Sequence, residues 1–422
     1  MRGDLFSDID FSDHLRVIAA VSGGSDSTGM LVLLHEHLSK LPSAPVCIAV
    51  TVDHGLRPES AQEAKVVAAL CARIGIEHRT KRWEAQKPAT GIQASAREAR
   101  YDLLMEAAHE VGAGLVLTGH TDDDQIETVF MRAARGEGPG LAGIAPATLS
   151  FFRDRGGPPV WFARPLLQTS RAAIRAEMAR GGIEWSDDPS NKNLEYERAR
   201  TRQGLASLPD EALAGLRQSQ ALWAAKRFDL SQRAGAVIDA HFSEASPGLF
   251  LFAPALADEP DKEAAAEALR ICLAFAGGVR EMIEKKAALD ILDCVASGKP
   301  FRRTGSRALL DSRKQGLFLL REKRNVRRDD GDFDGRYGYP LNALQAVGQA
   351  AVSGNLPPSL VRHAMALEPS ADGADSNALT RAGFRRILNP WPVRVPLFDL
   401  PAAAALARVA AIPAFPPAPC SL

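Results

Sequence analysis

The residues with the clearest chemical potential form a short string near the N-terminus, Ser22-Gly23-Gly24-Ser25-Asp26-Ser27. An apolar run at 17–21 precedes the string and predicts a buried strand, and residues 28–38 predict a helix. Glycines let a backbone approach an anion closely, and the unpaired amides at a helix start favour negative charge. The string therefore predicts a phosphate-binding loop with serine hydroxyl donors and with Asp26 near a magnesium ion. The chain contains no Gly-x-x-x-x-Gly-Lys-Ser/Thr string, which excludes a Walker loop.

A cluster of carboxylates provides a second candidate site. On a helix that begins near Asp122, Glu127 is the i+4 neighbour of Asp123 and the i+3 neighbour of Asp124. Like charges at these spacings destabilise a helix by about 0.2–0.5 kcal/mol per pair, although the helix dipole tolerates acids in a first turn. A solvated, well-capped helix start is therefore one interpretation. Because the acids directly follow an apolar run and His120, we favour binding of magnesium or of an ammonium group.

Alternating strands and helices are predicted up to about residue 185, and they would bring these sites together. Strands are predicted at 17–21, 46–52, 77–83 (an edge strand) and 115–119, and helices at 28–38, 58–74, 94–111 and 122–134. This alternation is typical of an α/β fold in which helices cover both faces of a parallel sheet. Ligands bind at the carboxyl ends of such strands. Since the phosphate loop, Asp53-His54 and His120 each follow a strand, we expect them to converge on one edge.

Several further strings carry a family resemblance. They are Val52-Asp53-His54-Gly55-Leu56-Arg57, Gly119-His120-Thr121-Asp122-Asp123-Asp124-Gln125-Ile126-Glu127-Thr128, Arg135-Gly136-Glu137-Gly138, Ala163-Arg164-Pro165-Leu166-Leu167 and Asp187-Asp188-Pro189-Ser190-Asn191. Together with the phosphate loop they resemble the tRNA(Ile)-lysidine synthetases, a family of the PP-loop (N-type) ATP pyrophosphatases. The match is strong from about residue 15 to 205 and thin to about 340. It implies the adenine nucleotide alpha hydrolase-like fold of a PP-loop ATPase.

The resemblance implies an ATP-dependent ligase. In this family the lysine ε-amine is joined to C2 of the wobble cytidine of tRNA(Ile) with a CAU anticodon, through an adenylated cytidine. The products are lysidine, AMP and pyrophosphate, and codon reading changes from AUG to AUA. ATP and Mg²⁺ are thus the implied cofactors, L-lysine and tRNA(Ile) the implied partners, and a monomer or homodimer the implied state. A PP-loop tRNA thiolation enzyme and a non-catalytic nucleotide-binding module remain as alternatives.

The resemblance also implies roles for individual residues of this chain. The implied catalytic residues are Asp26, Asp53, Asp123, Asp124, Glu127, Arg198 and Arg202. The implied ATP-binding residues are Ser22, Gly23, Gly24, Ser25, Asp26, Ser27, His54, Arg97 and His120, and the implied metal ligands are Asp26 and Asp123. Which acid orients lysine and which lies near ATP or metal stays open. The chain departs from the family pattern at Thr121-Asp122, where relatives have a second histidine or a small residue, and at Ala199, where they have asparagine.

Two pairs of arginines are spaced for phosphate binding. Arg97 and Arg100, and also Arg132 and Arg135, lie three residues apart and so share a helix face. The guanidinium fork binds phosphate oxygens with two parallel hydrogen bonds. Surface salt bridges explain the same residues equally well, so the sequence leaves both interpretations open.

The chain beyond residue 205 differs in composition from the part before it. Helices are predicted at 209–242, 263–275 and 280–296, so we expect a PP-loop domain at 1–205, a helical domain at 206–298 and a small α+β region at 299–422. In this last region a predicted hairpin around Lys314-Gln315-Gly316 lies among many lysines and arginines, which suits an RNA backbone, with a merely solvated basic surface as the alternative. The segment 390–422 is rich in proline and alanine and predicts an extended or partly disordered tail.

Overall composition gives little further indication of function. The 422 residues include 51 Lys plus Arg and 51 Asp plus Glu, so the net charge gives no hint either way about a nucleic-acid partner. Five scattered cysteines without a Cys-x-x-Cys pair suggest neither a disulfide framework nor a metal or iron–sulfur site, which also weighs against thiolation. No signal peptide or membrane-spanning run is visible, and we expect a reducing, cytoplasmic location.

Overall fold

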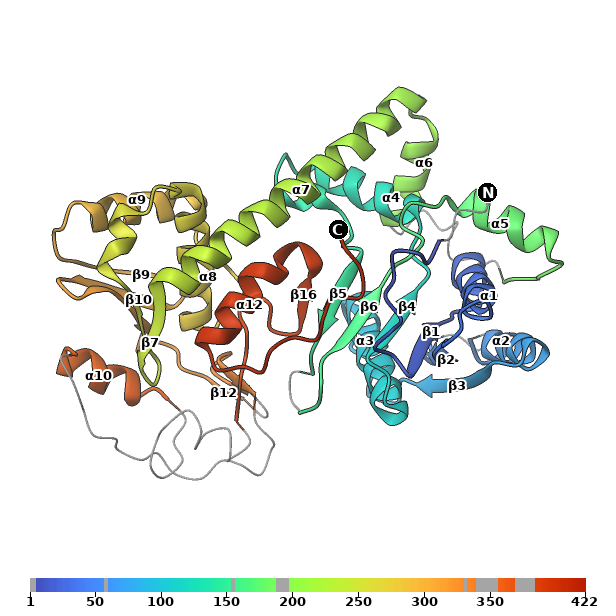
Figure 1. Cartoon of the computed structure of the whole chain (residues 1–422), viewed down its shortest axis with the longest axis horizontal. Coiled ribbons are helices and arrows are strands. Elements are labelled where there is room, and N and C mark those ends of the chain that lie inside the picture. Colours follow the sequence, from blue (N-terminus) through green and yellow to red (C-terminus); the bar gives the residue numbers. More distant parts are fainter. Residues whose placement is uncertain are drawn as a thin grey trace. The chain divides into compact units, whose positions relative to one another are not determined.

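The chain folds into two compact units. The computed structural model describes residues 5–56, 60–152, 156–186, 197–329, 332–338, 356–368 and 384–422. The first unit comprises Met1–Ser150, Pro158–Lys226 and Pro417–Leu422, and the second comprises Phe151–Gly157 and Arg227–Pro416 (Figure 1). The predicted motif Asp187–Asn191 and Arg57 of the Val52–Arg57 string lie outside the described residues.

A mostly parallel sheet forms the core of the first unit. Its strands run in the order β5-β6-β4-β1-β2-β3, with bounds β1 Arg16–Ala20, β2 Val46–Asp53, β3 Glu77–Arg82, β4 Leu115–Thr118, β5 Ala147–Ser150 and β6 Val160–Ala163. The central strand β1 pairs in parallel with β2 and β4, whereas β5 is antiparallel to β6. Strands β1 and β4 are almost wholly buried because helices cover both faces of the sheet. The predicted parallel sheet is confirmed.

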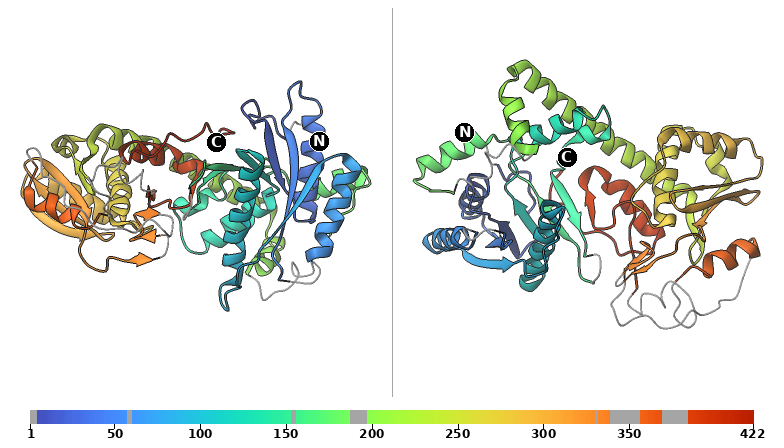
Figure 2. Two further views of the ribbon diagram at one scale, coloured as in Figure 1. Left: turned by 90° about the horizontal axis from the view of Figure 1, so that it is seen from below. Right: turned by 180° about the vertical axis from the view of Figure 1, so that it is seen from behind.

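Helices flank this sheet on both sides. Helices α1 (Ser25–Leu38) and α2 (Ser60–Ile74) follow β1 and β2, and α3 (Ile92–Val111) follows β3. Figures 1 and 2 show α2 and α3 on opposite faces of the sheet. This is expected from right-handed crossovers, because the chain moves from β1 to β3 in one direction and returns past β1 to reach β4. The remaining helical elements here are α4 Asp122–Ala133, η1 Pro139–Ala142, α5 Arg171–Arg180 and α6 Glu197–Ala206.

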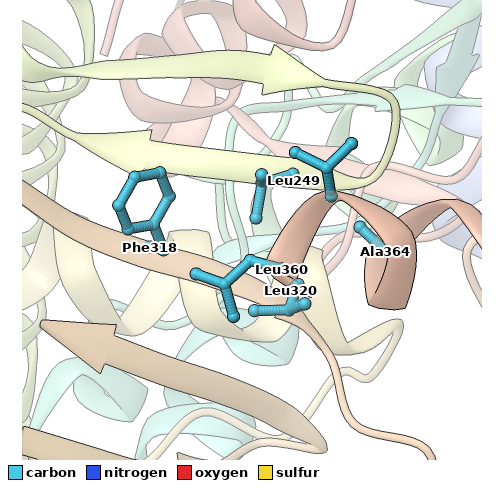
Figure 3. Packing of buried hydrophobic residues seen from close by; sticks show 6 residues of the cluster. Leu249, Phe318, Leu320, Leu360 and Ala364 are labelled. Carbon is cyan, nitrogen blue, oxygen red and sulfur yellow. The ribbon is translucent and has the colours of Figure 1, made fainter. Parts of the chain in front are cut away.

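The second unit is built on an antiparallel sheet of order β7-β8-β11-β10-β9. Its strands are β7 Phe242–Ser246, β8 Leu249–Phe252, β9 Phe301–Gly305, β10 Ala308–Arg313 and β11 Gly316–Arg321. Helix α10 (Pro358–Met365) packs against it, and Figure 3 shows Leu360 and Ala364 of this helix with Leu249, Phe318 and Leu320 of the sheet. The remaining elements of the chain are α7 Asp210–His241, η3 Pro254–Asp258, α8 Lys262–Gly277, α9 Lys285–Ala296, β12 Arg328–Asp329, β13 Asp332–Phe333, β14 Tyr337–Gly338, α10 Pro358–Met365, β15 Arg385–Arg386, β16 Arg394–Pro396, η4 Leu397–Asp399 and α12 Leu400–Val409.

This grouping differs from the three-part division expected from composition. Strands β7 and β8 lie within 206–298, yet β8 pairs with β11 in one sheet. The boundary between the compact units instead lies between Lys226 and Arg227, inside α7. Backbone pairing between segments far apart in sequence decides this grouping, and amino-acid composition cannot predict such pairing.

The predicted extended tail is wrong for residues 400–409. Here the chain forms α12, whose Ala403, Ala405 and Leu406 side chains are fully buried. Helix α12 packs closely against α7, since a Cβ at Gly235 of α7 would lie 3.0 Å from the Pro401 carbonyl oxygen. Because a run of alanines shows little contrast between apolar and polar positions, its sequence does not show that a helix face is buried.

The predicted hairpin is confirmed as β10 and β11, but several of its basic residues are internally paired. The Arg321 side chain is 1% exposed, and its Nε atom lies 2.7 Å from Asp334 Oδ2. The guanidinium groups of Arg302 and Arg313 both contact the buried Asp311 carboxylate. Arg302 is paired but stays exposed, and the other exposed bases of the described part are Lys299, Arg303, Lys314, Lys323, Arg324 and Arg327. In the described ranges, none of the helices combines the length and apolar content needed to cross a bilayer.

Candidate active site

The Ser22–Ser27 string forms a tight loop between β1 and α1. Gly23 has a φ of +88°, a left-handed conformation that favours glycine. The Ser22 amide donates to Ser27 Oγ at 3.0 Å, and this hydroxyl donates to the Gly24 carbonyl oxygen at 3.2 Å. Helix α1 then begins at Ser25, so the amides of its first turn have no earlier helical carbonyl to bond. The loop therefore has the amide-rich geometry that the sequence predicts for phosphate binding.

A close backbone approach holds the end of β4 against this loop. A Cβ atom at Gly119 would lie 2.7 Å from the Asp26 carbonyl oxygen and 2.8 Å from Ser27 Cα. Only glycine fits at this distance, because the neighbouring atoms are backbone. His120 and the acids of α4 follow Gly119 directly, and they are consequently placed next to the phosphate loop.

Helix α4 begins immediately after this contact. Asp124 Oδ2 accepts hydrogen bonds from the Thr121 amide at 3.0 Å and from Thr121 Oγ1 at 3.1 Å. The first of these bonds belongs to a capping box that Thr121 and Asp124 form at the helix start. One oxygen of Asp124 thus fixes the start of the helix. Its other oxygen, Oδ1, lies 3.5 Å from Arg171 Nη2. The capped helix start is therefore present, and the same side chain also faces Arg171, while its predicted role in binding stays a prediction.

Arg171 at the start of α5 joins the loop to the acids. Its Nε atom donates to Asp26 Oδ2 at 2.7 Å, and its backbone amide donates to Asp123 Oδ2 at 2.7 Å. Its Nη1 atom lies 3.8 Å from Glu127 Oε1. Sequence reasoning missed this residue, because a single arginine at a helix start has no signature of its own. The only available signal was its position shortly after the Ala163–Leu167 string.

Glu127 is the most deeply buried acid of the group. Its side chain is 3% exposed, and Oε1 accepts a hydrogen bond from Arg202 Nε of α6 at 2.6 Å. Within the described residues Oε2 has no hydrogen-bond partner. Burial raises the pKa of Glu127, while the nearby Arg202 charge opposes this change. Helices α4 and α6 thus bring together two residues that the sequence predicts for the site.

A positive environment surrounds His120. Burial and then the charges of Arg164 and Arg100 lower its pKa well below the ordinary value, so the ring is neutral at pH 7. Its Nδ1 atom lies 3.0 Å from Thr118 Oγ1. Arg97 and the exposed Arg198 contribute smaller effects in the same direction. These arginines therefore add a positive potential on the side of the site that contains His120.

Asp53 is the last residue of strand β2, and His54 follows it. The Asp53 carboxylate is buried and accepts a hydrogen bond from the Gly55 amide at 2.8 Å, which closes the turn after the strand. The His54 ring lies edge-on to Trp83, with 6.2 Å between ring centroids. Burial and the Arg100 charge lower the pKa of His54, and its Nδ1 atom has no hydrogen-bond partner in the described part of the chain. The structure therefore gives Asp53 a local structural role, and the predicted catalytic role remains a prediction.

The structure shows which groups contact Arg132, Arg135 and Asp122, three charged residues near the site. Arg132 donates to the Gly140 and Gly143 carbonyl oxygens at 2.8 and 2.9 Å, which favours a structural role, and Arg135 lies 3.5 Å from Glu197. The additional charge of Asp122 is compensated by Arg217 of α7, whose Nη2 and Nε atoms lie 2.7 and 3.1 Å from Asp122 Oδ2. Arg97 contacts the Tyr101 hydroxyl group at 3.4 Å. The departure Ala199 is buried on α6.

The acids outnumber the guanidinium groups that contact them. Within the described residues, the acids Asp26, Asp124 and Glu127 form ion pairs with only two arginines, Arg171 and Arg202, while Asp123 accepts a hydrogen bond from the Arg171 amide. In the described ranges no group of three or more His, Cys, Asp or Glu side chains is arranged to hold a metal ion by itself. Mg²⁺ is commonly held by one or two carboxylates together with substrate phosphates. The surplus of hard oxygen atoms beside a phosphate loop therefore fits Mg²⁺ with ATP, or an ammonium group.

The chain is similar to several known proteins. Residues 4–208 match the family model of the PP-loop domain. A tRNA(Ile)-lysidine synthase of Mesorhizobium japonicum is 40% identical, over 98% of this chain and 96% of its own length. One from Brucella ovis is 55% identical over 46% of this chain and 43% of its own length. Among solved structures, the U34-tRNA thiolase NcsA from Methanococcus maripaludis is similar with a TM-score of 0.43 and 17% identity, covering 52% of this chain and 76% of that chain.

Proposed function

The chain belongs to the tRNA(Ile)-lysidine synthase family, and from this premise we propose how its residues join lysine to the wobble cytidine of tRNA(Ile) at the expense of ATP. The observation that supports this most directly is the Arg171-centred network. It links a phosphate loop to a surplus of carboxylates, as a reaction between a nucleotide and an amine requires. A thiolation enzyme or a simple nucleotide-binding module has no evident need for these acids. Both alternatives are therefore less favoured.

The first chemical step occurs at the phosphate loop. The triphosphate of ATP lies against the first-turn amides of α1 and the serine hydroxyl groups. The C2 oxygen of the cytidine attacks the α-phosphorus, a new P–O bond forms, and the bond to pyrophosphate breaks. The amides stabilise the negative charge on the departing pyrophosphate. Asp26 and Asp123 would hold Mg²⁺, which supplies charge neutralisation at the phosphates when bound.

The second step takes place at the acids of α4. Asp124 and Glu127 bind the lysine ammonium group, and the amine must lose a proton before it attacks C2. Burial raises the pKa of Glu127, which brings this carboxylate closer to the working pH and makes it the better proton acceptor. The nitrogen–C2 bond then forms, the C2–O bond breaks, and AMP leaves with the oxygen. The residues mainly contribute positioning and electrostatic stabilisation.

The second unit would contact the tRNA through the exposed bases of β9 to β11 and the residues that follow them. A basic surface binds the phosphate backbone without reading sequence, so it would contribute affinity and orientation. Arg198 and Arg202 would contact substrate phosphates at the first unit, where Arg202 already holds Glu127. A cytoplasmic location and the choice between monomer and homodimer stay predictions.

Lysine transfer to an unmodified tRNA(Ile) transcript with a CAU anticodon tests the proposal. We expect radiolabelled lysine to enter the tRNA only with ATP and Mg²⁺, and equal amounts of AMP and pyrophosphate to form. Asp124→Asn should abolish transfer but preserve the fold, because an amide oxygen can still accept the Thr121 hydrogen bonds. Asp122→Asn is the matched control on the same helix turn. ATP cleavage without lysine transfer would instead support a thiolation enzyme or another nucleophile.

A further inference from the structure

The segment before α5 is fixed to the first turn of α4 by its backbone. The Asp122 amide donates to the Thr169 carbonyl oxygen at 3.0 Å, and the Arg171 amide donates to Asp123 Oδ2 at 2.7 Å. Ser170 caps α5, since its Oγ accepts a hydrogen bond from the Ala173 amide at 3.2 Å. The backbone at Arg171 is therefore held in place by the hydrogen bonds to α4 and by the Ser170 cap of α5.

Helix α5 is also packed closely onto α1. A Cβ atom at Gly29 would lie 2.3 Å from Ile174 Cγ2, so a glycine permits the two helices to approach. One turn after Arg171, Arg175 Nε donates to Ser25 Oγ in the phosphate loop at 3.1 Å. The first turn of α5 is thus fixed both to the acids and to the loop.

The Arg171 guanidinium lies between the phosphate loop and the acids of α4. It donates to Asp26 Oδ2 at 2.7 Å, and its two terminal nitrogens lie 3.5 Å from Asp124 Oδ1 and 3.8 Å from Glu127 Oε1. Its side chain is only 20% exposed, so these charges interact with little screening by water. A planar fork can face three carboxylates at once, whereas a lysine ammonium is a single point charge.

We propose that Arg171 is a positioning residue for lysine transfer, which holds the phosphate-loop acid Asp26 and the lysine-binding acids Asp124 and Glu127 in one geometry. The inference rests on the proposed function, because that function assigns lysine to these acids. Arg171 acts through the carboxylates and does not contact the reacting atoms. Without it, mutually repelling carboxylates separate, and the amine is no longer aligned with the adenylated cytidine. A misplacement of about 1 Å can lower a rate about 100-fold.

The test compares Arg171→Gln and Arg171→Lys in the full-length protein. Arg180→Gln is the matched control, because Arg180 lies on the same helix and forms an exposed pair with Glu177. The measurements are kcat, the KM values for lysine and ATP, calorimetric binding of L-lysine, and the melting temperature. We expect Arg171→Gln to lower kcat about 100-fold and to raise the KM and Kd for lysine more than the KM for ATP. Guanidinium ion at non-denaturing concentration should restore part of the rate, and sodium chloride of equal ionic strength should not.

Each outcome decides the inference. Kinetic parameters of Arg171→Gln equal to those of Arg180→Gln would overturn it, as would a loss that follows the melting temperature and is not restored by guanidinium. If Arg171→Gln does not fold, Arg171→Lys decides: lowered kcat at an unchanged melting temperature supports the inference, and unchanged kcat refutes it. Failure of the unaltered protein to transfer lysine would refute the proposed function, whereas normal transfer by both Arg171 variants would refute only the role of Arg171.

Discussion

Removing the positive partner of Glu127 should destabilise the first unit in a pH-dependent way. In Arg202→Met the buried Oε1 of Glu127 loses its 2.6 Å hydrogen bond, and among the described residues Arg171 Nη1 remains as its cationic partner, at 3.8 Å. Breaking a buried ion pair on one side costs about 3–5 kcal/mol. Because 31% of the Arg202 side chain is exposed and Glu127 can take up a proton, we expect a smaller loss, about 2 kcal/mol at neutral pH.

The sign of the pH dependence follows from the raised pKa of Glu127. A carboxyl group with a higher pKa in the folded state favours folding when protonated, so its destabilising effect appears as pH rises above the ordinary carboxyl range. Loss of Arg202 raises this pKa further and leaves Asp124 as a like charge nearby. The difference in unfolding free energy between the parent and Arg202→Met should therefore be small in acid and grow towards neutral pH.

Hydrogen exchange of the α4 amides, followed in increasing urea at several pH values, measures this difference within the first unit alone. The double variant Glu127→Gln/Arg202→Met is the control, because it removes both charges and should recover most of the stability. A difference that does not depend on pH, or that is largest in acid, would refute the assignment to Glu127.

Three further predictions concern the loop, the helix start and the RNA surface. Gly119→Ala places a Cβ 2.7 Å from the loop backbone and should raise the KM for ATP at least about tenfold, whereas Gly215→Ala, which meets no atom within 4 Å, should not. Arg217→Ala leaves Asp122 uncompensated beside the site and should also raise the KM for ATP, and the double variant Asp122→Asn/Arg217→Ala should restore it; a steady-state assay measures both. Lys314→Gln should weaken tRNA binding and reduce the slope of log affinity against log salt by about 1, without changing the KM for ATP, which filter binding at several salt concentrations can check.

The sequence contained most of the information needed to predict the first unit. Strands such as β1 and β4 are short apolar runs with a glycine soon after them, and predicted helices lie between the strands. The hydrophobic period, the length of each segment and the flanking glycines therefore predict the same elements. The phosphate loop and the acids of α4 could be placed on one edge because parallel strands end on the same side. These are local signals, and each lies within a few residues of the element that it predicts.

Partners distant in sequence were not predictable in the same way. Asp122 and Arg217 are 95 residues apart, as two unremarkable charges on separate helices. Arg321 belongs to a run of basic residues that suggests an exposed surface, yet its side chain is buried in an ion pair with Asp334. A charged residue shows by its type that it needs a partner or water, but only the fold decides which one it receives.

The site itself illustrates why such distant partners matter. Carboxylates next to a phosphate loop create an electrostatic conflict, because both they and the triphosphate are negative. Arg171 reduces that conflict only because α5 packs through Ile174 onto Gly29 of α1, which brings its guanidinium between Asp26 and Asp124. In the proposed reaction, the lysine ammonium group and a cation that accompanies the nucleotide would neutralise these carboxylates further. The phosphate loop and the acids are therefore separate motifs in the sequence, and one arginine from a third segment contacts both of them.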